Sequence, residues 1–140
     1  MKFLFDTNVV SEVRRPSPDP KVLNWIGSLR EDQIYLSVAT IAELKRGINL
    51  MPNGRRRLAL AAWADSELPL RIGARLLPIL ATTCEIWAEV TGASDRKGHK
   101  MDTLDAFIAS TAIEHGLVLV TRNVKDFKFT QVELFNPWED

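Results

Sequence analysis

The run Lys2-Phe3-Leu4-Phe5-Asp6, at residues 2–6, decides how the rest of this chain is interpreted. Its uninterrupted apolar core predicts a buried strand over residues 2–6. Asp6 ends this strand, and a carboxylate directly after a buried strand is costly unless it has a partner. Asp6 could simply be the N-cap of a helix that begins near Asn8, or it could belong to a functional site.

Outward from this strand, predicted helices and strands alternate along the chain. Further strands are predicted at residues 34–37, 75–79, 117–121 and 132–135. Helices are predicted at residues 8–14, 20–30, 39–50, 55–67 (extending toward Ile72), 81–94 and 103–115, with a stiff proline-rich loop at Pro16–Pro20. This alternation predicts an α/β fold with three α/β/α layers and a mostly parallel sheet of four to five strands. The 140 residues fit a single domain spanning 1–140.

Polar side chains fall at matching places in this alternation. Asp6 follows a strand, Glu43 and Asp105 lie near the starts of helices, and Asp126 follows the strand end at residues 121–123. Crossover helices run antiparallel to the strands of a parallel sheet, so helix N-termini and strand C-termini share one edge. Carboxylates gathered at that edge repel one another unless a cation joins them. The pattern therefore predicts a divalent-metal site.

Each acid also has a purely structural interpretation. Thr40-x-x-Glu43 matches a capping box. Asp102 could cap the helix that contains Asp105, and Asp126 could be a turn residue. The buried stripe of that helix is predicted to contain Leu104, Phe107, Ile108 and Thr111. Asp105 lies at the margin of this stripe and Asp102 points away, which favours Asp105 as the ligand and Asp102 as the cap.

Composition excludes several classes of protein. Lysine plus arginine and aspartate plus glutamate both total 18, which argues against a strongly basic nucleic-acid coat but leaves room for a local basic patch. Cys84 is the one cysteine, expected in the core on a helix, and it favours the reducing cytoplasm. The acidic start does not match a signal peptide, and no apolar run approaches the roughly 20 residues of a membrane span.

The two histidines do not indicate a zinc site. His115 precedes Gly116 at a helix end, where a cation is favoured and glycine suits the C′ position. His99 lies among basic residues and is expected to be solvated. The sequence also lacks the Gly-x-Ser-x-Gly elbow of serine hydrolases and a glycine-rich phosphate loop after a strand.

Four segments in this order resemble the signatures of PIN-domain proteins, and most closely the VapC/FitB type of toxin–antitoxin ribonuclease. They are residues 5–12 (FDTNVVSE), 37–44 (SVATIAEL), 105–112 (DAFIASTA) and 121–127 (TRNVKDF). The resemblance extends to residues 134–138 (LFNPW). It implies a Mg²⁺- or Mn²⁺-dependent endoribonuclease, usually a homodimer, that is inhibited by a small DNA-binding antitoxin.

The resemblance also implies roles for individual residues. The three core acids of the family correspond to Asp6, Glu43 and Asp105. Many members have a fourth acid after the last long strand, where this chain has Asn123, with Asp126 as the alternative.

The chemistry of RNA hydrolysis fits these acids. Mg²⁺ held by Asp6 and Asp105 can bind a phosphate oxygen and lower the pKa of a bound water, while Glu43 binds a second ion or orients the water. Hard oxygen ligands suit Mg²⁺ or Mn²⁺ better than zinc. The hydroxyls of Thr7 and Thr121 are expected to support these ligands.

Basic residues near the catalytic edge are candidates for RNA binding, although each could instead lie on a solvated face. They are Arg14, Arg15, Arg96, Lys97, Lys100 and Arg122. Residues 55–57 are less suitable, because cations at a helix start oppose its dipole.

The helices between residues 39 and 67 offer a groove for an antitoxin helix. Its apolar candidates are Leu50, Met51, Leu58, Leu60 and Trp63, which could instead complete the core or a homodimer.

Two other functions remain compatible with the sequence. A PIN-like module could bind nucleic acid or protein without catalysis. A phosphotransfer domain could use Asp6 as its nucleophile, but a phosphatase of the haloacid-dehalogenase type would have aspartate at the position of Asn8.

Overall fold

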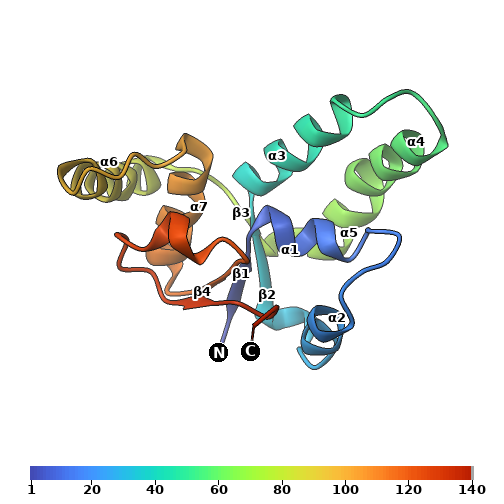
Figure 1. The fold of residues 1–140 in the computed structure, drawn as a ribbon, viewed down its shortest axis with the longest axis horizontal. Helices are drawn as coiled ribbons and strands as arrows, with labels where there is room; N and C mark the ends of the chain where they lie inside the picture. Colours follow the sequence, from blue (N-terminus) through green and yellow to red (C-terminus); the bar gives the residue numbers. More distant parts are fainter. Residues whose placement is uncertain (140) are drawn as a thin grey trace.

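Short parallel strands form the centre of the molecule (Figure 1). The structure is a computed structural model that describes residues 1–139. Within these residues the sheet has five strands in the order β3-β2-β1-β4-β5, and every neighbouring pair is parallel. The strands are β1 (Phe3–Phe5), β2 (Ile34–Ser37), β3 (Leu76–Leu77), β4 (Val118–Val120) and β5 (Leu134–Phe135). The predicted α/β class and parallel sheet are confirmed.

Helices cover both faces of this sheet. They are α1 (Thr7–Glu12), α2 (Pro20–Gly27), α3 (Val38–Asn49), α4 (Arg55–Ala62), α5 (Leu68–Ile72), α6 (Ala81–Arg96) and α7 (Thr103–His115). Short 3₁₀ turns lie at η1 (Glu31–Gln33), η3 (Gly73–Arg75) and η4 (Val124–Phe127), and a π-helical turn lies at η2 (Trp63–Glu67). None of the helices in residues 1–139 combines the length and apolar character that crossing a bilayer requires.

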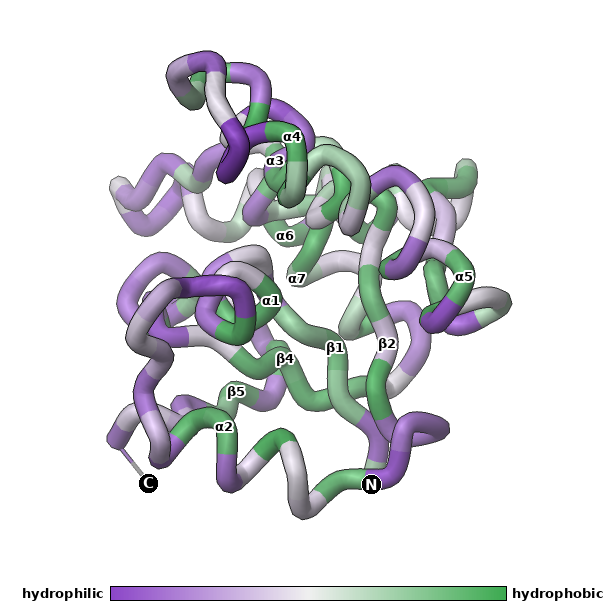
Figure 2. The backbone as a smooth tube through the Cα atoms, turned by 90° about the vertical axis from the view of Figure 1, so that its right-hand side faces the viewer, coloured by the Kyte–Doolittle hydropathy of each residue, from purple (hydrophilic) through white to green (hydrophobic). Residues whose placement is uncertain are grey.

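The strand sequences alternate between two hydrophobic cores. Phe3 and Phe5 face a core that also contains Trp63 from η2, whereas Leu4 faces a second core with Ile108 from α7. Successive side chains of a strand point to opposite faces, so a strand in the middle of three layers must be apolar throughout. In Figure 2, β1, β2 and β4 accordingly form a hydrophobic centre beneath hydrophilic loops.

Polar caps fix where the main helices begin and end. The Ser37 side chain accepts a hydrogen bond from the Ala39 amide and caps α3, so Thr40 is not the cap and the Thr40-x-x-Glu43 capping box is wrong. Asp102 caps α7 by accepting from the backbone amides of residues 104 and 105, as predicted. Gly116 ends α7 in the left-handed region at φ 65°, where glycine is favoured.

The predicted helix from residue 55 toward Ile72 contains a π-helical turn. Pro69 has no backbone N–H, and its ring would clash with the carbonyl four residues earlier, that of Asp65. The helical turn widens before Pro69, and the Leu68 amide donates a hydrogen bond to the carbonyl of Trp63, five residues earlier. The turn therefore has an identifiable cause in the sequence.

Some predicted details differ from the structure. The strand predicted at 75–79 is limited to Leu76–Leu77, because Arg75 belongs to η3 and Pro78 cannot donate to a sheet ladder. Cys84 is exposed rather than in the core. It follows Thr83, which is fully buried, and the next residue of a helix points about 100° away.

Candidate metal centre

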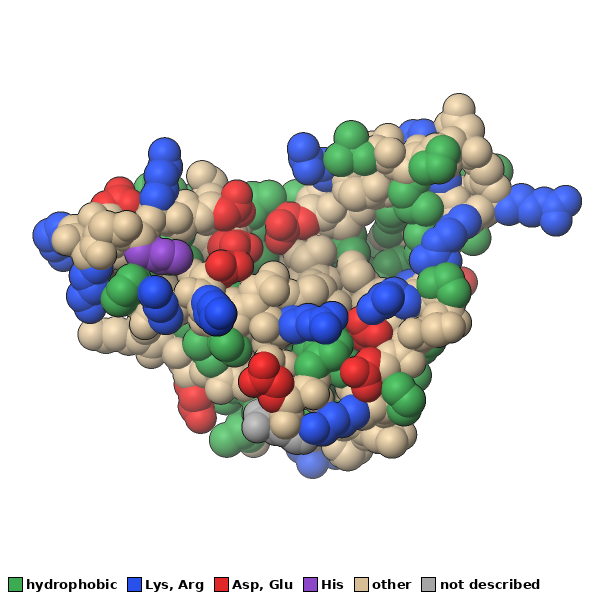
Figure 3. Space-filling model, viewed as in Figure 1, with side chains coloured by type: hydrophobic (Ala, Val, Ile, Leu, Met, Phe, Trp, Pro, Cys, Tyr) green, Lys and Arg blue, Asp and Glu red, His purple; other side chains and the backbone are tan. Residues whose placement is uncertain are grey.

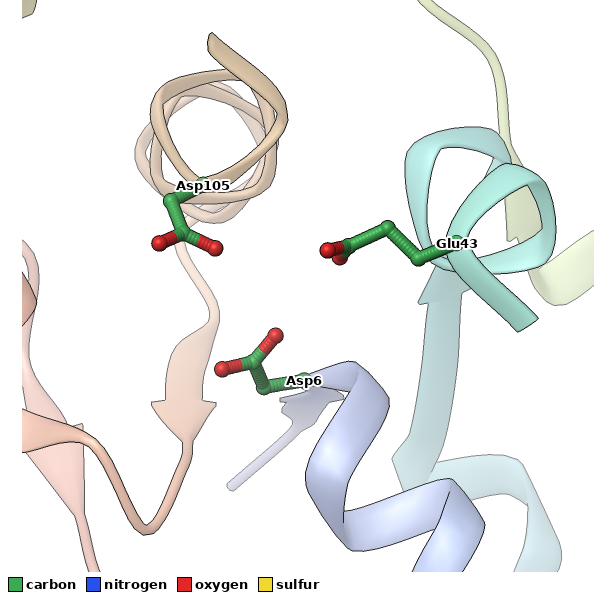
Figure 4. Close-up of side chains that lie close together, drawn as sticks. All are labelled: Asp6, Glu43 and Asp105. Carbon is green, nitrogen blue, oxygen red and sulfur yellow. The ribbon is translucent and has the colours of Figure 1, made fainter. Parts of the chain in front are cut away.

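Three carboxylates from three separate elements meet at the carboxyl edge of the sheet (Figure 4). Asp6 directly follows β1, Glu43 lies on α3, and Asp105 lies in the first turn of α7. Each offers an oxygen atom, and these atoms all lie within 4.8 Å of one another. Residues far apart in the sequence are thus brought together, as the alternation of strands and helices predicts.

Asp6 is held by hydrogen bonds to both carboxylate oxygens. The Thr121 hydroxyl donates to Oδ2 at 2.7 Å, and the backbone amide of Thr7 donates to Oδ1 at 2.8 Å. The second contact makes Asp6 the N-cap of α1. Asp6 is 4% exposed. Its carboxylate has two oxygens, so it can cap α1 and also belong to the acidic cluster.

Thr7 connects two of the three acids. Its backbone amide contacts Asp6, and its hydroxyl donates to Oε1 of Glu43 at 2.7 Å. This contact directs the Glu43 side chain toward Asp6. The structure therefore gives Thr7 and Thr121 the supporting positions expected from the sequence.

Asn8 is a site residue that the sequence analysis missed. Its side-chain nitrogen lies 3.4 Å from Oδ2 of Asp6 and 3.3 Å from the hydroxyl of Thr121, and its oxygen accepts from the Arg122 amide at 3.2 Å. Asn8 thereby joins the end of β1 to the end of β4. Its place two residues after Asp6, within the segment at residues 5–12, is the signal in the sequence that points to it.

Burial and mutual repulsion raise the pKa of each acid. Asp105 has a pKa of about 7, raised first by desolvation and then by the charges of Asp6 and Glu43. Desolvation is also the largest cause of the raised pKa of Asp6 and of Glu43. Three hard oxygen donors whose negative charge is poorly compensated fit Mg²⁺ or Mn²⁺.

Residues 3–132 match the PIN-domain family. The chain belongs to the PIN-domain family.

Relatives of this PIN domain cover nearly all of it. It is 38% identical over 138 residues to the toxin FitB of Neisseria gonorrhoeae, covering 98% of this chain and 99% of the relative. It is 33% identical over 136 residues to the VapC ribonuclease Y4jK of Sinorhizobium fredii, covering 97% of each. The crystal structure of FitAcB from Neisseria gonorrhoeae superposes with a TM-score of 0.92 at 34% identity, over 99% of both chains.

Two residues of the PIN domain compete for the place of a fourth acid. Asn123 is exposed, and its backbone amide donates to the Thr121 hydroxyl at 3.0 Å. Asp126, in η4, is also exposed, but its charge raises the pKa of both Asp6 and Asp105. Asp126 is therefore a carboxylate whose charge acts on two of the three acids, while Asn123 contacts the Thr121 hydroxyl that supports Asp6, and both stay candidates.

Basic side chains flank the acids on the same face of the PIN domain (Figure 3). Among the predicted RNA-binding residues, Arg15 pairs with the buried Glu12 at 3.2 Å, which gives it a structural role. Arg14 lies over the ring of Trp63 and Arg122 over Trp138, at 5.0 and 5.3 Å from the ring centroids. Arg96, Lys97 and Lys100 are exposed near the end of α6.

The lining of an apolar hollow includes Phe5, the residue before Asp6, but none of the three acids. The hollow has a volume of about 290 Å³ and lies between α1, η2 and α5. Its lining includes Val9, Val13, Arg14, Trp63, Leu68 and Ile72. Trp63 is buried and completes the core, whereas Leu50 and Leu58 are 69% and 71% exposed.

Proposed function

We propose that this PIN domain is a metal-dependent endoribonuclease that acts as the toxin of a toxin–antitoxin pair. The observation that carries the proposal is the set of three carboxylates, with oxygens within 4.8 Å of one another, at the edge where α/β sheets bind ligands. The similarity to toxin FitB and to a VapC ribonuclease over nearly the whole chain supports it.

Asp6, Glu43 and Asp105 would hold Mg²⁺ or Mn²⁺, with Asp126 or Asn123 as the candidate for a further ligand. When bound, the metal polarises a phosphate oxygen and lowers the pKa of a coordinated water. The three acids must be ionised to act as ligands, and binding a cation lowers their pKa values. Glu43, held by the Thr7 hydroxyl, would bind a second ion or orient the attacking water as a base.

Basic residues around the site would bind the RNA backbone. Arg14 and Arg122 carry guanidinium groups that suit phosphate oxygens. Lys97 and Lys100 are exposed, and their long side chains can reach the phosphates of an RNA strand. Bound metal also reduces the repulsion between the acids and the substrate, since it offsets most of their negative charge.

The antitoxin would occupy the apolar hollow beside the site. A helix of a partner protein fits a groove of this kind through its apolar face. An arginine from the same partner could pair with the carboxylates and displace the metal. We further propose that the PIN domain is a homodimer and that its antitoxin binds DNA, as the solved FitAB structure, bound to a DNA fragment, suggests for that relative.

Phosphotransfer through Asp6 is a weaker explanation of the site. Both oxygens of Asp6 accept hydrogen bonds, and the residue is 4% exposed. A nucleophilic carboxylate needs an oxygen that can reach the phosphorus atom. An acyl-phosphate on Asp6 would revive this alternative.

The decisive experiment is cleavage of defined RNAs by the purified protein with Mg²⁺, Mn²⁺ or EDTA. We expect cleavage with either metal, none in EDTA, and none by the Asp6→Asn variant. Metal binding without cleavage of any RNA would favour a non-catalytic module.

A second experiment tests whether the protein encoded by the adjacent gene co-purifies with this PIN domain. If that neighbour neither binds nor suppresses cleavage, the toxin–antitoxin assignment fails while the nuclease assignment stands.

A further inference from the structure

An aromatic ring surrounded by basic groups lies outside the set of three carboxylates and has no role in the proposed metal chemistry. The ammonium groups of Lys97 and Lys128 lie 5.3 and 4.9 Å from the ring centroid of Phe129. The His99 ring packs edge-on against the same ring at 5.5 Å. We call these four residues the Phe129 cluster.

Two anchored turns hold this cluster in place. The backbone amides of Lys97 and His99 both donate to the carbonyl of Ser94, which is fully buried. On the other side, the amide and the hydroxyl of Thr130 both donate to the carbonyl of Phe127, which is 1% exposed. The ring and the cations are thus presented by backbone that the core fixes.

Asp126 links the cluster to the catalytic edge. The His99 ring nitrogen lies 3.4 Å from the backbone oxygen of Asp126. The charge of Asp126 in turn raises the pKa of Asp6 and of Asp105. Figure 3 shows a histidine among lysine and arginine side chains beside the acidic group, on one face of the molecule.

The charges of this region are not neutralised by the protein itself. Across residues 1–139, no ion pair involves the lysines at positions 97, 100, 125 and 128. Uncompensated lysines around a half-buried aromatic ring match what single-stranded nucleic acid requires: cations for the phosphates and an aromatic face for a base. A chain without net charge therefore concentrates positive charge next to its acidic site.

We propose that the Phe129 cluster binds one nucleotide of single-stranded RNA close to the scissile phosphate. The Phe129 ring stacks on the base, and Lys97 and Lys128 bind the flanking phosphates. This inference rests on the proposed ribonuclease function and names the form of RNA that the site takes. A base paired in an A-form duplex has both faces covered, so the cluster selects unpaired segments.

The lysine contacts do not prevent stacking. An ammonium group over a ring that solvent reaches contributes less than a base stacked on the same ring. An arriving base therefore displaces a lysine from the ring, and the released ammonium group gains a phosphate partner. RNA binding thus replaces ammonium–ring contacts with base stacking and ammonium–phosphate contacts, which are stronger together.

Two substitutions at one position separate stacking from simple apolar packing. Phe129→Leu keeps an apolar side chain but removes the aromatic face, and Phe129→Trp enlarges that face. With a short single-stranded RNA, we expect Phe129→Leu to raise KM by roughly 5- to 100-fold with little change in kcat, and Phe129→Trp to preserve KM. A fluorescent purine analogue in the RNA reports stacking directly, since its emission falls on binding to the wild type and to Phe129→Trp only.

The lysines are tested by the salt dependence of binding. Lys97→Gln and Lys128→Gln should each reduce the slope of log affinity against log salt by about 0.7. Lys2→Gln is the matched control, because Lys2 lies over the Tyr35 ring at 5.6 Å, at the opposite edge of the sheet. It should leave the slope unchanged.

The outcomes distinguish this inference from the proposed function. If the wild type cleaves RNA and Phe129→Leu has an unchanged KM, the inference is overturned and the nuclease assignment stands. If no RNA is cleaved but binding still depends on Phe129, the cluster is an RNA-binding surface without the proposed catalysis. If Phe129→Leu instead loses affinity only for the antitoxin, the cluster is a protein interface and the inference fails.

Discussion

The carboxyl group of Asp105 has a pKa of about 7 because it is partly desolvated and faces two other acids. Replacing it with asparagine removes a ligand and also removes this repulsion. We therefore expect Asp105→Asn to abolish metal-dependent cleavage while raising metal-free stability at pH 8 by about 1 kcal/mol, a value discounted for the solvent that reaches the group. RNA cleavage and thermal melts in EDTA measure the two effects.

Asp102→Asn is the matched control for this prediction. Asp102 caps the same helix from an exposed position, and asparagine caps helices as well as aspartate does. This variant should keep most of its activity. Full activity in Asp105→Asn would remove Asp105 from the site.

The Thr121 hydroxyl tests how much the supporting hydrogen bonds matter. Thr121 is fully buried and donates to Asp6 at 2.7 Å. In Thr121→Val the pKa of Asp6 rises further, and we expect Mn²⁺ affinity in calorimetry to fall by about 10- to 100-fold. The control is Thr111→Val, because Thr111 is equally buried but donates to the Phe107 carbonyl within α7. Equal losses in both variants would indicate a general packing effect.

Single residues also show where sequence reasoning reached its limit. The meeting of Asp6, Glu43 and Asp105 was predictable because Asp6 follows a strand and the other two lie in the first two turns of helices that start at the same edge. The role of Asn8 was not, since its three contacts depend on how β1 and β4 are placed side by side. Likewise, the choice between Asn123 and Asp126 depends on the path of a loop, which periodicity does not determine.

At the scale of elements, α4 and the residues just after α1 border a second hollow. Ala59 lines it together with Val13, Arg14, Arg55, Arg56 and Leu60. This hollow adjoins the one proposed for the antitoxin, because Val13 and Arg14 line both. In Ala59→Glu, the new side chain fills the second hollow and pairs with Arg55 and Arg56, so an antitoxin helix loses room beside its proposed site. We expect antitoxin affinity to fall at least about tenfold, with RNA cleavage by the free protein unchanged.

Ala62→Glu provides the comparison for that prediction. Ala62 is exposed on the same helix but does not line the hollow. Ala62→Glu changes the helix propensity by the same amount as Ala59→Glu, and we expect it to leave antitoxin binding intact. Titration calorimetry with the purified antitoxin measures both variants, and equal affinities would exclude this hollow from the interface.

The existence of the elements was easier to predict than their details. Apolar periodicity identified the strands and the main helices, because burial on one or two faces leaves a direct trace in the sequence. The exposure of Cys84 was predicted wrongly, since a small residue fits either side of a helix. The π-helical turn depends on Pro69, whose effect is on hydrogen bonds four and five residues back.

At the scale of the whole molecule, the acidic cluster makes stability depend on pH. The folded pKa of Asp105 lies above its ordinary value of 3.8, so the folded state holds a proton that the unfolded state has lost. The metal-free protein should therefore lose stability as pH rises from about 4 to about 7 and change little above that. Melts in EDTA across this range test it, with Asp105→Asn as the flatter reference.

Metal binding should show the opposite trend. The acids must lose their protons to become ligands, so Mn²⁺ affinity should rise with pH and level off above about pH 7. Calorimetry in buffers of different ionisation enthalpy measures the protons released. An affinity that is constant from pH 6 to pH 8 would contradict the coupling between Asp105 and the metal.

The pairing of β1 with β4 has a consequence for how the protein is made. β1 emerges from the ribosome first, whereas its neighbour β4 and the Thr121 hydroxyl come more than a hundred residues later. A chain that stops before α7 carries only two of the three acids and lacks a central strand. An unfinished copy therefore cannot assemble the metal-binding site. Under the proposed function, the capacity to cleave RNA is completed only when translation of the chain has nearly ended.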